Sequence, residues 1–267
     1  MDFKDRVAIV TGASSGIGEA LVRQLAREGA RVVLAARSEE QLQAVAASLD
    51  AERVLVVPTD VTEPADIDHL IERTATRFGG IDILVNNAGF GLYGGTEEIL
   101  WEHLRQMWEV NFFGAVRCTR AALPYLCARR GVVVNISSVA GKIVVPYMTQ
   151  YCATKHALNA FSDGLRMELR QAGVRVVTVC PGRVRTRFHQ AAYRDSKNLP
   201  AVLRRQDVGG ISADAVALAT LRAVRRGRRE IVIPWRLRLA AGLRKLFPAL
   251  VEASLARWVR PSQPTGD

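Results

Sequence analysis

A tyrosine and a lysine stand four residues apart, at Tyr151 and Lys155, in a segment with helical periodicity. Residues four apart on a helix lie on one face, so the phenol and the ammonium are predicted to point into the same space. A nearby cation lowers the pKa of a phenol by about 1–3 units, toward the range in which it exchanges protons near neutral pH. The pair therefore indicates acid–base catalysis. The alternative is an ordinary pair of helical neighbours, because this spacing often occurs by chance.

A glycine-rich turn near the N-terminus has the context of a nucleotide-binding loop. The β-branched run at residues 6–11 is typical of a buried parallel strand, and Gly12, Gly16 and Gly18 follow it. An amphipathic helix comes next and stops at Gly29. Glycines let the backbone approach a pyrophosphate closely, and the helix N-terminus supplies free N–H groups. We expect a dinucleotide to bind here.

The second predicted strand, residues 31–35, is followed by Ala36, Arg37 and Ser38 and not by an acidic residue. A carboxylate in this region would hold the 2′-hydroxyl of an adenosine ribose. A guanidinium suits a phosphate far better than a hydroxyl. Arg37 therefore predicts NADP in preference to NAD. The alternative is that Arg37 is a solvated residue at the start of the next helix.

Further strands are predicted at residues 53–58, 81–85, 131–138, 175–180 and 230–234. Ligands of open α/β sheets bind beyond the carboxyl ends of the strands, so the polar residues at these ends are binding candidates. Asp60 either accepts from an adenine amino group or caps the helix that begins near Pro64, although Thr62 is better placed to cap it. Asn86 and Asn87 either tie strand ends together or contact a sugar.

Two further segments bear on the site. A helix is predicted from residue 97 to 123, with Asn111 among apolar neighbours. A polar side chain in such company usually finds a hydrogen-bond partner, so Asn111 is either purely structural or bends the helix near an active site. Residues 183–210 lack clear periodicity, which is typical of a lid over a site or of a disordered loop. Ser212 is predicted to cap the helix that follows.

Together these motifs resemble the short-chain dehydrogenase/reductase family over about residues 5–190. The resemblance is carried by Thr11-Gly12-x-x-x-Gly16-x-Gly18, Asp60, Asn86-Asn87-Ala88-Gly89, Asn111, Ser138, Tyr151-x-x-x-Lys155 and Pro181-Gly182. It implies an α/β fold: a Rossmann-like, doubly wound, seven-stranded parallel sheet in a single domain, with a C-terminal helical extension. It also implies a catalytic tetrad of Asn111, Ser138, Tyr151 and Lys155, and it selects Ser138 over Ser137. The residues it implies for binding NADP(H) are Gly12, Ser14, Ser15, Gly16, Ile17, Gly18, Arg37, Asp60, Val61, Asn87, Ala88, Gly89, Tyr151, Lys155, Pro181, Gly182 and Val184.

The resemblance implies an NADP-dependent oxidoreductase that exchanges a hydride between the nicotinamide and a carbonyl or secondary alcohol, as in a ketone reductase or an alcohol or hydroxysteroid-type dehydrogenase. In this role Ser138 positions the substrate oxygen and Tyr151 exchanges the proton. Lys155 lowers the pKa of Tyr151 and holds the nicotinamide ribose, while Asn111 holds a water that connects Lys155 to solvent. The alternatives are an enoyl reductase or epimerase on the same scaffold, and a non-enzymatic nucleotide-sensing or scaffold protein.

The predicted substrate side is apolar, which favours a hydrophobic ketone or alcohol. The candidate substrate residues follow the fourth strand, precede the catalytic tyrosine or lie in the lid: Tyr93, Val145, Tyr147 and Phe188. Tyr147 is a weak candidate for the catalytic tyrosine, because its lysine is eight positions on and off its helical face. The alternative is that several of these side chains simply pack under loops.

The net charge of +11 comes mainly from the C-terminal end. Residues 222–267 contain eleven Lys or Arg and three Asp or Glu, a surplus of eight, so the remainder contributes only three. Residues 1–234 are predicted to form the Rossmann domain, with the lid at about 183–210, and residues 235–267 a basic amphipathic extension. We expect its apolar side to cover the substrate pocket or a neighbouring subunit. Contact with an anionic membrane surface is the alternative.

Composition also limits location and partners. The start of the chain lacks a signal-peptide pattern, and no apolar run approaches about 18 residues. The four cysteines are scattered, with no C-x-x-C, so we expect reduced thiols in a cytoplasmic protein, with neither disulfides nor a metal site. A homodimer or homotetramer is expected. No nucleic-acid partner is expected, because no reading helix or aromatic platform accompanies the charge.

Overall fold

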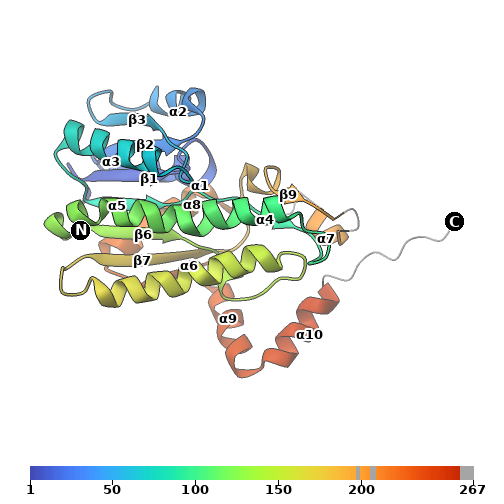
Figure 1. The fold of residues 1–267 in the computed structure, drawn as a ribbon. Coiled ribbons are helices and arrows are strands. Elements are labelled where there is room, and N and C mark those ends of the chain that lie inside the picture. The colour runs from blue at the N-terminus through green and yellow to red at the C-terminus, as the bar shows by residue number, and fades with distance from the viewer. Residues whose placement is uncertain (197–198, 205–208, 259–267) are drawn as a thin grey trace.

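A sheet of seven parallel strands forms the centre of the computed structural model, which describes residues 1–196, 199–204 and 209–258 (Figure 1). The strand order is β11-β7-β6-β4-β1-β2-β3, and every neighbouring pair is parallel. This confirms the predicted seven-stranded, doubly wound sheet. The strands are β1 (Val7–Thr11), β2 (Arg31–Ala36), β3 (Val54–Pro58), β4 (Ile83–Asn86), β6 (Val132–Ile136), β7 (Arg175–Pro181) and β11 (Glu230–Ile233).

Helices cover both faces of the sheet, because side chains of a strand point alternately to its two sides. In β1, Ala8 and Val10 face one hydrophobic core, while Val7 and Ile9 face the other. The first core is covered by α1 (Gly16–Arg27), α2 (Glu39–Ala46) and α8 (Ala213–Arg225). The second is covered by α3 (Pro64–Phe78), α5 (Gly114–Arg129) and α6 (Thr149–Glu168), which lie in front of the sheet in Figure 1.

The segment predicted as one helix from residue 97 to 123 differs from that prediction at both ends and in its interior. It consists of α4 (Trp101–Trp108), a π-helical turn η1 (Glu109–Phe113) and α5. It begins later than predicted, at Trp101, and the N–H of Leu100 before it donates to the Asp195 carboxylate at 3.0 Å. The π-helical turn inserts one residue into the helical repeat, a feature that often occurs at functional sites.

The cap predicted for α3 is wrong. Glu63 is the N-cap residue, without a capping side-chain bond, and Pro64 begins the helix. The Asp60 carboxylate accepts from the N–H and the hydroxyl of Thr62 at 2.9 and 2.8 Å, so the two side chains bond to each other and not to the helix end. The Asp66 carboxylate turns back to accept from the Asp60 N–H at 2.8 Å.

The region predicted as a lid contains several short elements. Strand β8 (Val184–Arg185) pairs with β10 (Ile211–Ser212), and β9 (Tyr193–Arg194) pairs with β5 (Leu92–Tyr93). The 3₁₀ turn η3 (Arg187–His189) and the short helix α7 (Ala201–Arg204) lie between them. Residues 197–198 and 205–208 of the predicted lid lie outside the described residues. Ser212 caps α8 as predicted, accepting from the Ala215 N–H at 3.1 Å.

Two C-terminal helices project from the body, as the lower part of Figure 1 shows. They are α9 (Arg236–Leu246) and α10 (Pro248–Trp258). The predicted extension ran to residue 267, and residues 259–267 lie outside the described residues. Among the helices that the structure describes, none combines the length and apolar composition needed to cross a bilayer.

Candidate active site

Buried hydrogen bonds join the carboxyl ends of β1, β4 and β6. Asn86 Nδ2 donates to Asn135 Oδ1 at 2.8 Å and to Thr119 Oγ1 at 3.0 Å. Asn87 Nδ2 donates to the carbonyl oxygens of Thr11 and of the following residue, at 2.9 and 3.1 Å. Of the two roles left open by the sequence, both asparagine side chains therefore tie strand ends together.

The glycine loop between β1 and α1 has a backbone shape that suits a bound phosphate. Gly12 and Gly16 have positive φ values of 64° and 60°, and a Cβ atom on Gly18 would lie 2.1 Å from the Gly12 carbonyl oxygen. Ser15 is the N-cap residue of α1, but its side chain makes no capping hydrogen bond. The first N–H groups of the helix therefore lack a side-chain acceptor and are available to an anion. Ser14 and Ile17 are half-buried in the same turn.

Thr186, which the sequence did not single out, packs against this loop. A Cβ atom on Gly16 would lie 3.2 Å from the Thr186 Cγ2 methyl group. The Thr186 hydroxyl also caps η3, accepting from the Phe188 N–H at 3.3 Å. From the sequence, a threonine before a short turn predicts only a capping role. It does not predict a contact with a loop 170 residues away.

Arg37 stands beside the glycine loop. The Ala13 N–H in that loop donates to the Ala35 carbonyl at the end of β2, at 3.2 Å, and Arg37 follows two residues later. Its side chain is exposed and makes no salt bridge with any residue that the structure describes. At the next strand, Asp60 is half-buried, while Val61 is buried against α5, where a Cβ on Gly114 would lie 2.8 Å from Val61 Cγ2.

Tyr151, Lys155 and Ser138 come together at the carboxyl end of the sheet. Tyr151 and Lys155 are 6% and 4% exposed, and Lys155 Nζ lies 5.7 Å from the centre of the Tyr151 ring. The Ser138 side chain lies next to the Tyr151 phenol and lowers its pKa. The neighbouring Ser137 instead donates its hydroxyl to the Lys155 carbonyl at 3.3 Å. Between the two serines, the geometry therefore brings Ser138 to the phenol.

Burial opposes charge on both ionisable groups. It raises the pKa of Tyr151 above its ordinary value, and the neighbouring Ser138 side chain only partly offsets this rise. Burial also lowers the pKa of Lys155 from 10.5 to about 8. The predicted fall in the pKa of Tyr151 is therefore wrong for this arrangement, because desolvation, which raises the pKa, is the largest influence on the phenol. The phenol is protonated at neutral pH and has a proton to donate.

The lowered pKa of Lys155 has a consequence for stability. Between pH 8 and 10.5 the unfolded chain binds more protons at this residue than the native chain, so stability rises with pH across this window. From pH 7 to 10, the unfolding free energy of the wild type should rise relative to that of Lys155→Met by on the order of 2 kcal/mol. Urea unfolding of both proteins at the two pH values measures this. Lys4→Met, at an exposed lysine, is the matched control, and equal changes in all three proteins would contradict the prediction.

Asn111 lies at the centre of the π-helical turn and is 1% exposed. Its Oδ1 accepts from the Phe90 N–H, and its Nδ2 donates to the Phe90 carbonyl, both at 2.9 Å. Gly89 lies between it and Lys155, since a Cβ there would be 3.0 Å from Asn111 Oδ1 and 3.6 Å from Lys155 Nζ. Asn111 is therefore held in place by its two hydrogen bonds to Phe90, and it also lies in a π-helical turn next to Lys155.

Ala88 follows Asn87 in the chain, and its N–H donates to Thr11 Oγ1 at 3.1 Å.

The end of β7 supplies the opposite side of the site. The Pro181 carbonyl accepts from the Ser138 hydroxyl at 3.5 Å, and the Gly182 N–H donates to the Ile233 carbonyl at 2.6 Å. The Val184 side chain is buried in the core on the α1 side of the sheet.

The four candidate substrate residues share one apolar region but differ in what they face. The Phe188 ring meets the Tyr151 ring edge to face at 5.7 Å, which places it directly against the phenol-bearing residue. Val145 and Tyr147 pack in the same apolar clusters, and Tyr147 has a positive φ of 63°. Such a backbone is strained for a non-glycine residue, and strain of this kind concentrates at functional sites.

Tyr93 is 2% exposed, and its hydroxyl is already engaged. It lies 2.6 Å from His189 Nδ1, and the Arg194 guanidinium lies 4.9 Å from the centre of its ring. Burial lowers the pKa of His189 to about 4, helped by Arg183 and Arg194, so a neutral imidazole shares the hydrogen bond with the Tyr93 hydroxyl. No local pattern pointed to His189, because it contacts Tyr93 across 96 residues of the chain.

Comparisons with known proteins agree with this geometry. The family model described as short chain dehydrogenase matches residues 6–197. An uncharacterized oxidoreductase of Staphylococcus aureus strain MW2 is 42% identical over 193 residues, which cover 72% of this chain and 83% of the relative. The structure of a short chain dehydrogenase/reductase from Burkholderia phymatum in complex with NAD aligns over the whole of both chains, with a TM-score of 0.85 and 27% identity. An alcohol dehydrogenase from the archaeon Thermococcus sibiricus, complexed with 5-hydroxy-NADP, aligns with a TM-score of 0.76 and 30% identity over 86% of this chain and 96% of its own.

Proposed function

The chain belongs to the short-chain dehydrogenase family of oxidoreductases, and we propose that it is an NADP-dependent reductase of hydrophobic ketones that also oxidises the corresponding secondary alcohols. One observation carries this proposal: a buried, protonated phenol at Tyr151 lies next to Ser138 and Lys155 at the carboxyl end of the sheet. The glycine loop stands at the same end, as a nucleotide site of an open α/β sheet does.

In the proposed reaction, a bound NADP(H) supplies or accepts the hydride at the substrate carbon. Ser138 donates a hydrogen bond to the carbonyl oxygen and positions it. Tyr151 Oη gives its proton to that oxygen in reduction and takes it back in oxidation. Lys155 holds positive charge beside the phenolate that remains after donation, and Asn111 fixes the helical turn beside Lys155. Burial keeps the phenol protonated, which is the state that proton donation in reduction requires.

The residues of this chain also support a choice of cofactor. The pyrophosphate would approach the N-terminus of α1 past three glycines, Gly12, Gly16 and Gly18. The nicotinamide ribose would be held by Tyr151 and Lys155. The exposed Arg37 guanidinium would hold a 2′-phosphate, and it has no competing salt bridge with a described residue. Asp60 remains the candidate for the adenine amino group, although part of its carboxylate is taken by Thr62.

Arg37→Gln should raise the KM for NADPH by about tenfold or more and leave the KM for NADH nearly unchanged, because a charge-assisted bond to the phosphate is lost. Steady-state kinetics with both cofactors measure this. Arg27→Gln is the matched control, since Arg27 is also an exposed arginine, at the far end of α1. Equal losses with NADPH and NADH would show that Arg37 does not read the phosphate.

The function is tested by a scan of ketones with NADPH, followed by the loss of reduced-nicotinamide absorbance. The panel should span small polar ketones, bulky aromatic ketones, steroid ketones and long-chain acyl ketones, because apolar side chains such as Phe188 surround Tyr151. Turnover that improves with the apolar area of the ketone supports the proposal. Turnover confined to activated alkenes would point to an enoyl reductase, and binding of NADPH without turnover of any compound would point to a nucleotide sensor.

A further inference from the structure

Four large apolar side chains line the outer face of α9 and the residue before it. These residues are Trp235, Leu239, Leu243 and Leu246. Their spacing of four, four and three residues places them in a single stripe along a helix. They are 66%, 64%, 44% and 75% exposed. An amphipathic helix normally turns such a stripe toward its own core. The expectation that this apolar side covers the substrate pocket of its own chain is therefore wrong.

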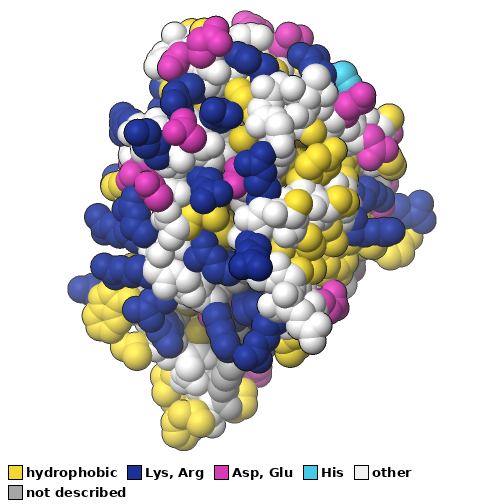
Figure 2. Space-filling model, turned by 90° about the vertical axis from the view of Figure 1, so that its left-hand side faces the viewer, with side chains coloured by type: hydrophobic (Ala, Val, Ile, Leu, Met, Phe, Trp, Pro, Cys, Tyr) yellow, Lys and Arg dark blue, Asp and Glu magenta, His cyan; other side chains and the backbone are white. Residues whose placement is uncertain are grey.

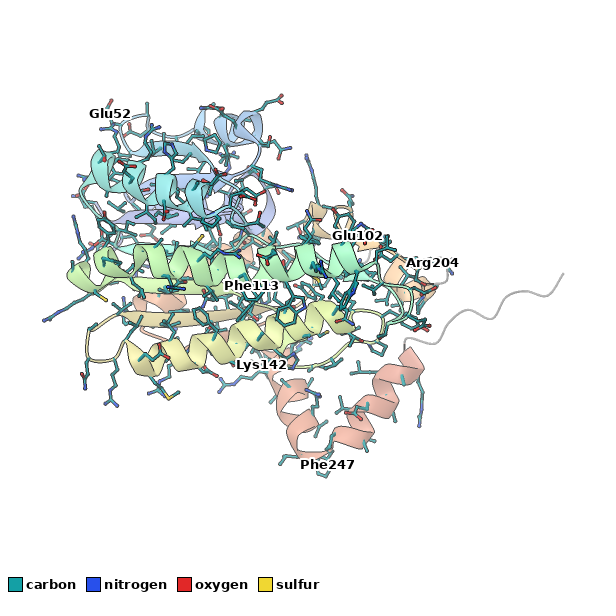
Figure 3. The ribbon with its side chains drawn as sticks, in the orientation of Figure 1. Glu52, Glu102, Phe113, Lys142, Arg204 and Phe247 are labelled. Carbon is teal, nitrogen blue, oxygen red and sulfur yellow. The ribbon has the colours of Figure 1, made fainter. Side chains whose placement is uncertain are left out.

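The apolar surface continues around the turn into α10. Phe247 and Leu250 are 54% and 65% exposed, and Figure 3 shows Phe247 at the tip of the hairpin, far from the sheet. We call the six exposed residues the hairpin stripe: Trp235, Leu239, Leu243, Leu246, Phe247 and Leu250. A contiguous exposed patch of large apolar side chains usually marks an interaction surface.

The hairpin is also basic. Arg236, Arg238 and Arg257 are exposed on it. Residues 235–258 contain five Lys or Arg and one Glu, which gives a net charge of +4. Figure 2 shows yellow hydrophobic side chains on the lobe that projects at the bottom of the molecule and dark blue Lys and Arg side chains above it. The combination of a long apolar stripe, a tryptophan and flanking arginines is typical of helices that lie in the interface of a bilayer.

Two contacts fix the hairpin to the body beside the candidate active site. Leu237, on the inner side of α9, packs so closely that a Cβ atom on Gly182 would lie 2.5 Å from its Cδ1. Arg244 Nη1 donates to the Lys142 carbonyl at 3.0 Å, in the segment that follows Ser138. The inner side of α9 is thus occupied by the body, and the outer side remains for a partner.

We propose that the α9–α10 hairpin docks this protein on an anionic lipid bilayer, with the hairpin stripe in the acyl boundary and the arginines at the headgroups. A second copy of the chain is a poorer partner for this surface. In a two-fold contact the same patch would face itself, so two hairpins that each carry +4 would repel one another. An anionic bilayer satisfies both the apolar area and the charge. The contacts at Gly182 and Lys142 then hold the candidate active site close to the bilayer surface.

Sedimentation of the full chain with phosphatidylcholine vesicles, with and without phosphatidylserine, tests this proposal without any turnover or cofactor. The wild type should bind the phosphatidylserine vesicles at least tenfold more tightly, and added salt should weaken this binding. Arg236→Gln/Arg238→Gln should weaken it by about 30-fold, since each basic residue near such a surface contributes about a factor of five. The matched control is Arg27→Gln/Arg73→Gln, at two exposed arginines on α1 and α3, which should bind like the wild type.

A second pair of variants tests the apolar side. Leu239→Glu/Leu243→Glu should abolish sedimentation with the vesicles, whereas Met167→Glu, at a 73% exposed apolar residue of α6, should leave it unchanged. The proposal is overturned if the wild type does not sediment with phosphatidylserine vesicles, or if the control variants lose as much binding as the hairpin variants. It is also overturned if the wild type ignores vesicles and Leu239→Glu/Leu243→Glu dissociates an oligomer in analytical ultracentrifugation, because the stripe is then a subunit interface.

Discussion

Tyr151→Phe should lower kcat for ketone reduction by about 10³-fold or more, while NADPH still binds. The substitution removes only the hydroxyl and therefore only the proposed proton donor. The ring contacts that hold residue 151 remain, namely the edge-to-face contact with Phe188 at 5.7 Å and the position of Lys155 Nζ 5.7 Å from the ring centre. A large loss of kcat without loss of cofactor affinity would thus identify a role in the chemical step.

The control for this variant is Tyr147→Phe. Tyr147 lies four residues earlier and packs in the neighbouring apolar cluster, so it experiences much of the same local environment. We expect a change in kcat of less than about tenfold, because Tyr147 is proposed to line the pocket and not to exchange a proton. Rates come from steady-state kinetics with the best ketone of the scan, and NADPH affinity comes from quenching of protein fluorescence. If Tyr151→Phe kept near-normal turnover, the catalytic assignment would fail.

Ser138 is expected to keep its remaining partners in Tyr151→Phe. Its Oγ accepts from the Ala140 N–H at 3.0 Å and donates to the Pro181 carbonyl at 3.5 Å. The thermal midpoint should therefore change by only a few degrees, as expected for the loss of one buried hydroxyl group. A collapse of stability would instead mean that the lost activity reports unfolding.

Gly18→Ala should be the most damaging single-methyl substitution in the nucleotide loop. The new Cβ would lie 2.1 Å from the Gly12 carbonyl oxygen and 2.6 Å from Asn87 Nδ2. The carbonyl belongs to a backbone held at positive φ, and the amide is bonded to the end of β1, so neither can move without breaking the loop. We expect a loss of about 2–3 kcal/mol in the free energy of unfolding, a fall of about 5–10 °C in Tm and at least tenfold weaker NADPH binding.

Gly242→Ala is the matched control for this variant. Gly242 lies in α9, and a Cβ there would meet no atom within 4 Å. Alanine should therefore be neutral or stabilise the helix by up to about 1 kcal/mol. Differential scanning calorimetry and a binding titration with NADPH measure both variants. If Gly18→Ala melted and bound NADPH like the wild type, the close approach of α1 to the loop would have no energetic consequence.

The architecture was predictable because it follows from local patterns. The β-branched runs at residues 6–11 and 175–180 could only satisfy their two apolar faces as buried strands, and the structure places them in β1 and β7. The glycine turn and the helix after it were readable for the same reason, since glycine and helical periodicity act on a few neighbouring residues. The four-residue spacing of Tyr151 and Lys155 likewise fixed their common helix face before any tertiary contact was known.

Tertiary structure alone decided the environment of these groups. Asn111 lies in a π-helical turn and is bonded to Phe90, 21 residues away, a contact that no helical pattern encodes. Thr186 reaches Gly16 across the molecule, and Tyr93 pairs with His189 across 96 residues. The direction of the Tyr151 pKa shift depended on how completely the fold excludes water from the phenol.

The sequence by itself thus determined the sheet, the nucleotide loop and the order of the candidate catalytic residues along the chain. The folded molecule decided which serine meets the phenol, and it left the apolar side of α9 facing outward where burial was expected. The physical reason is that backbone periodicity is set by adjacent residues, whereas desolvation and side-chain pairing are set by whatever distant segments pack alongside.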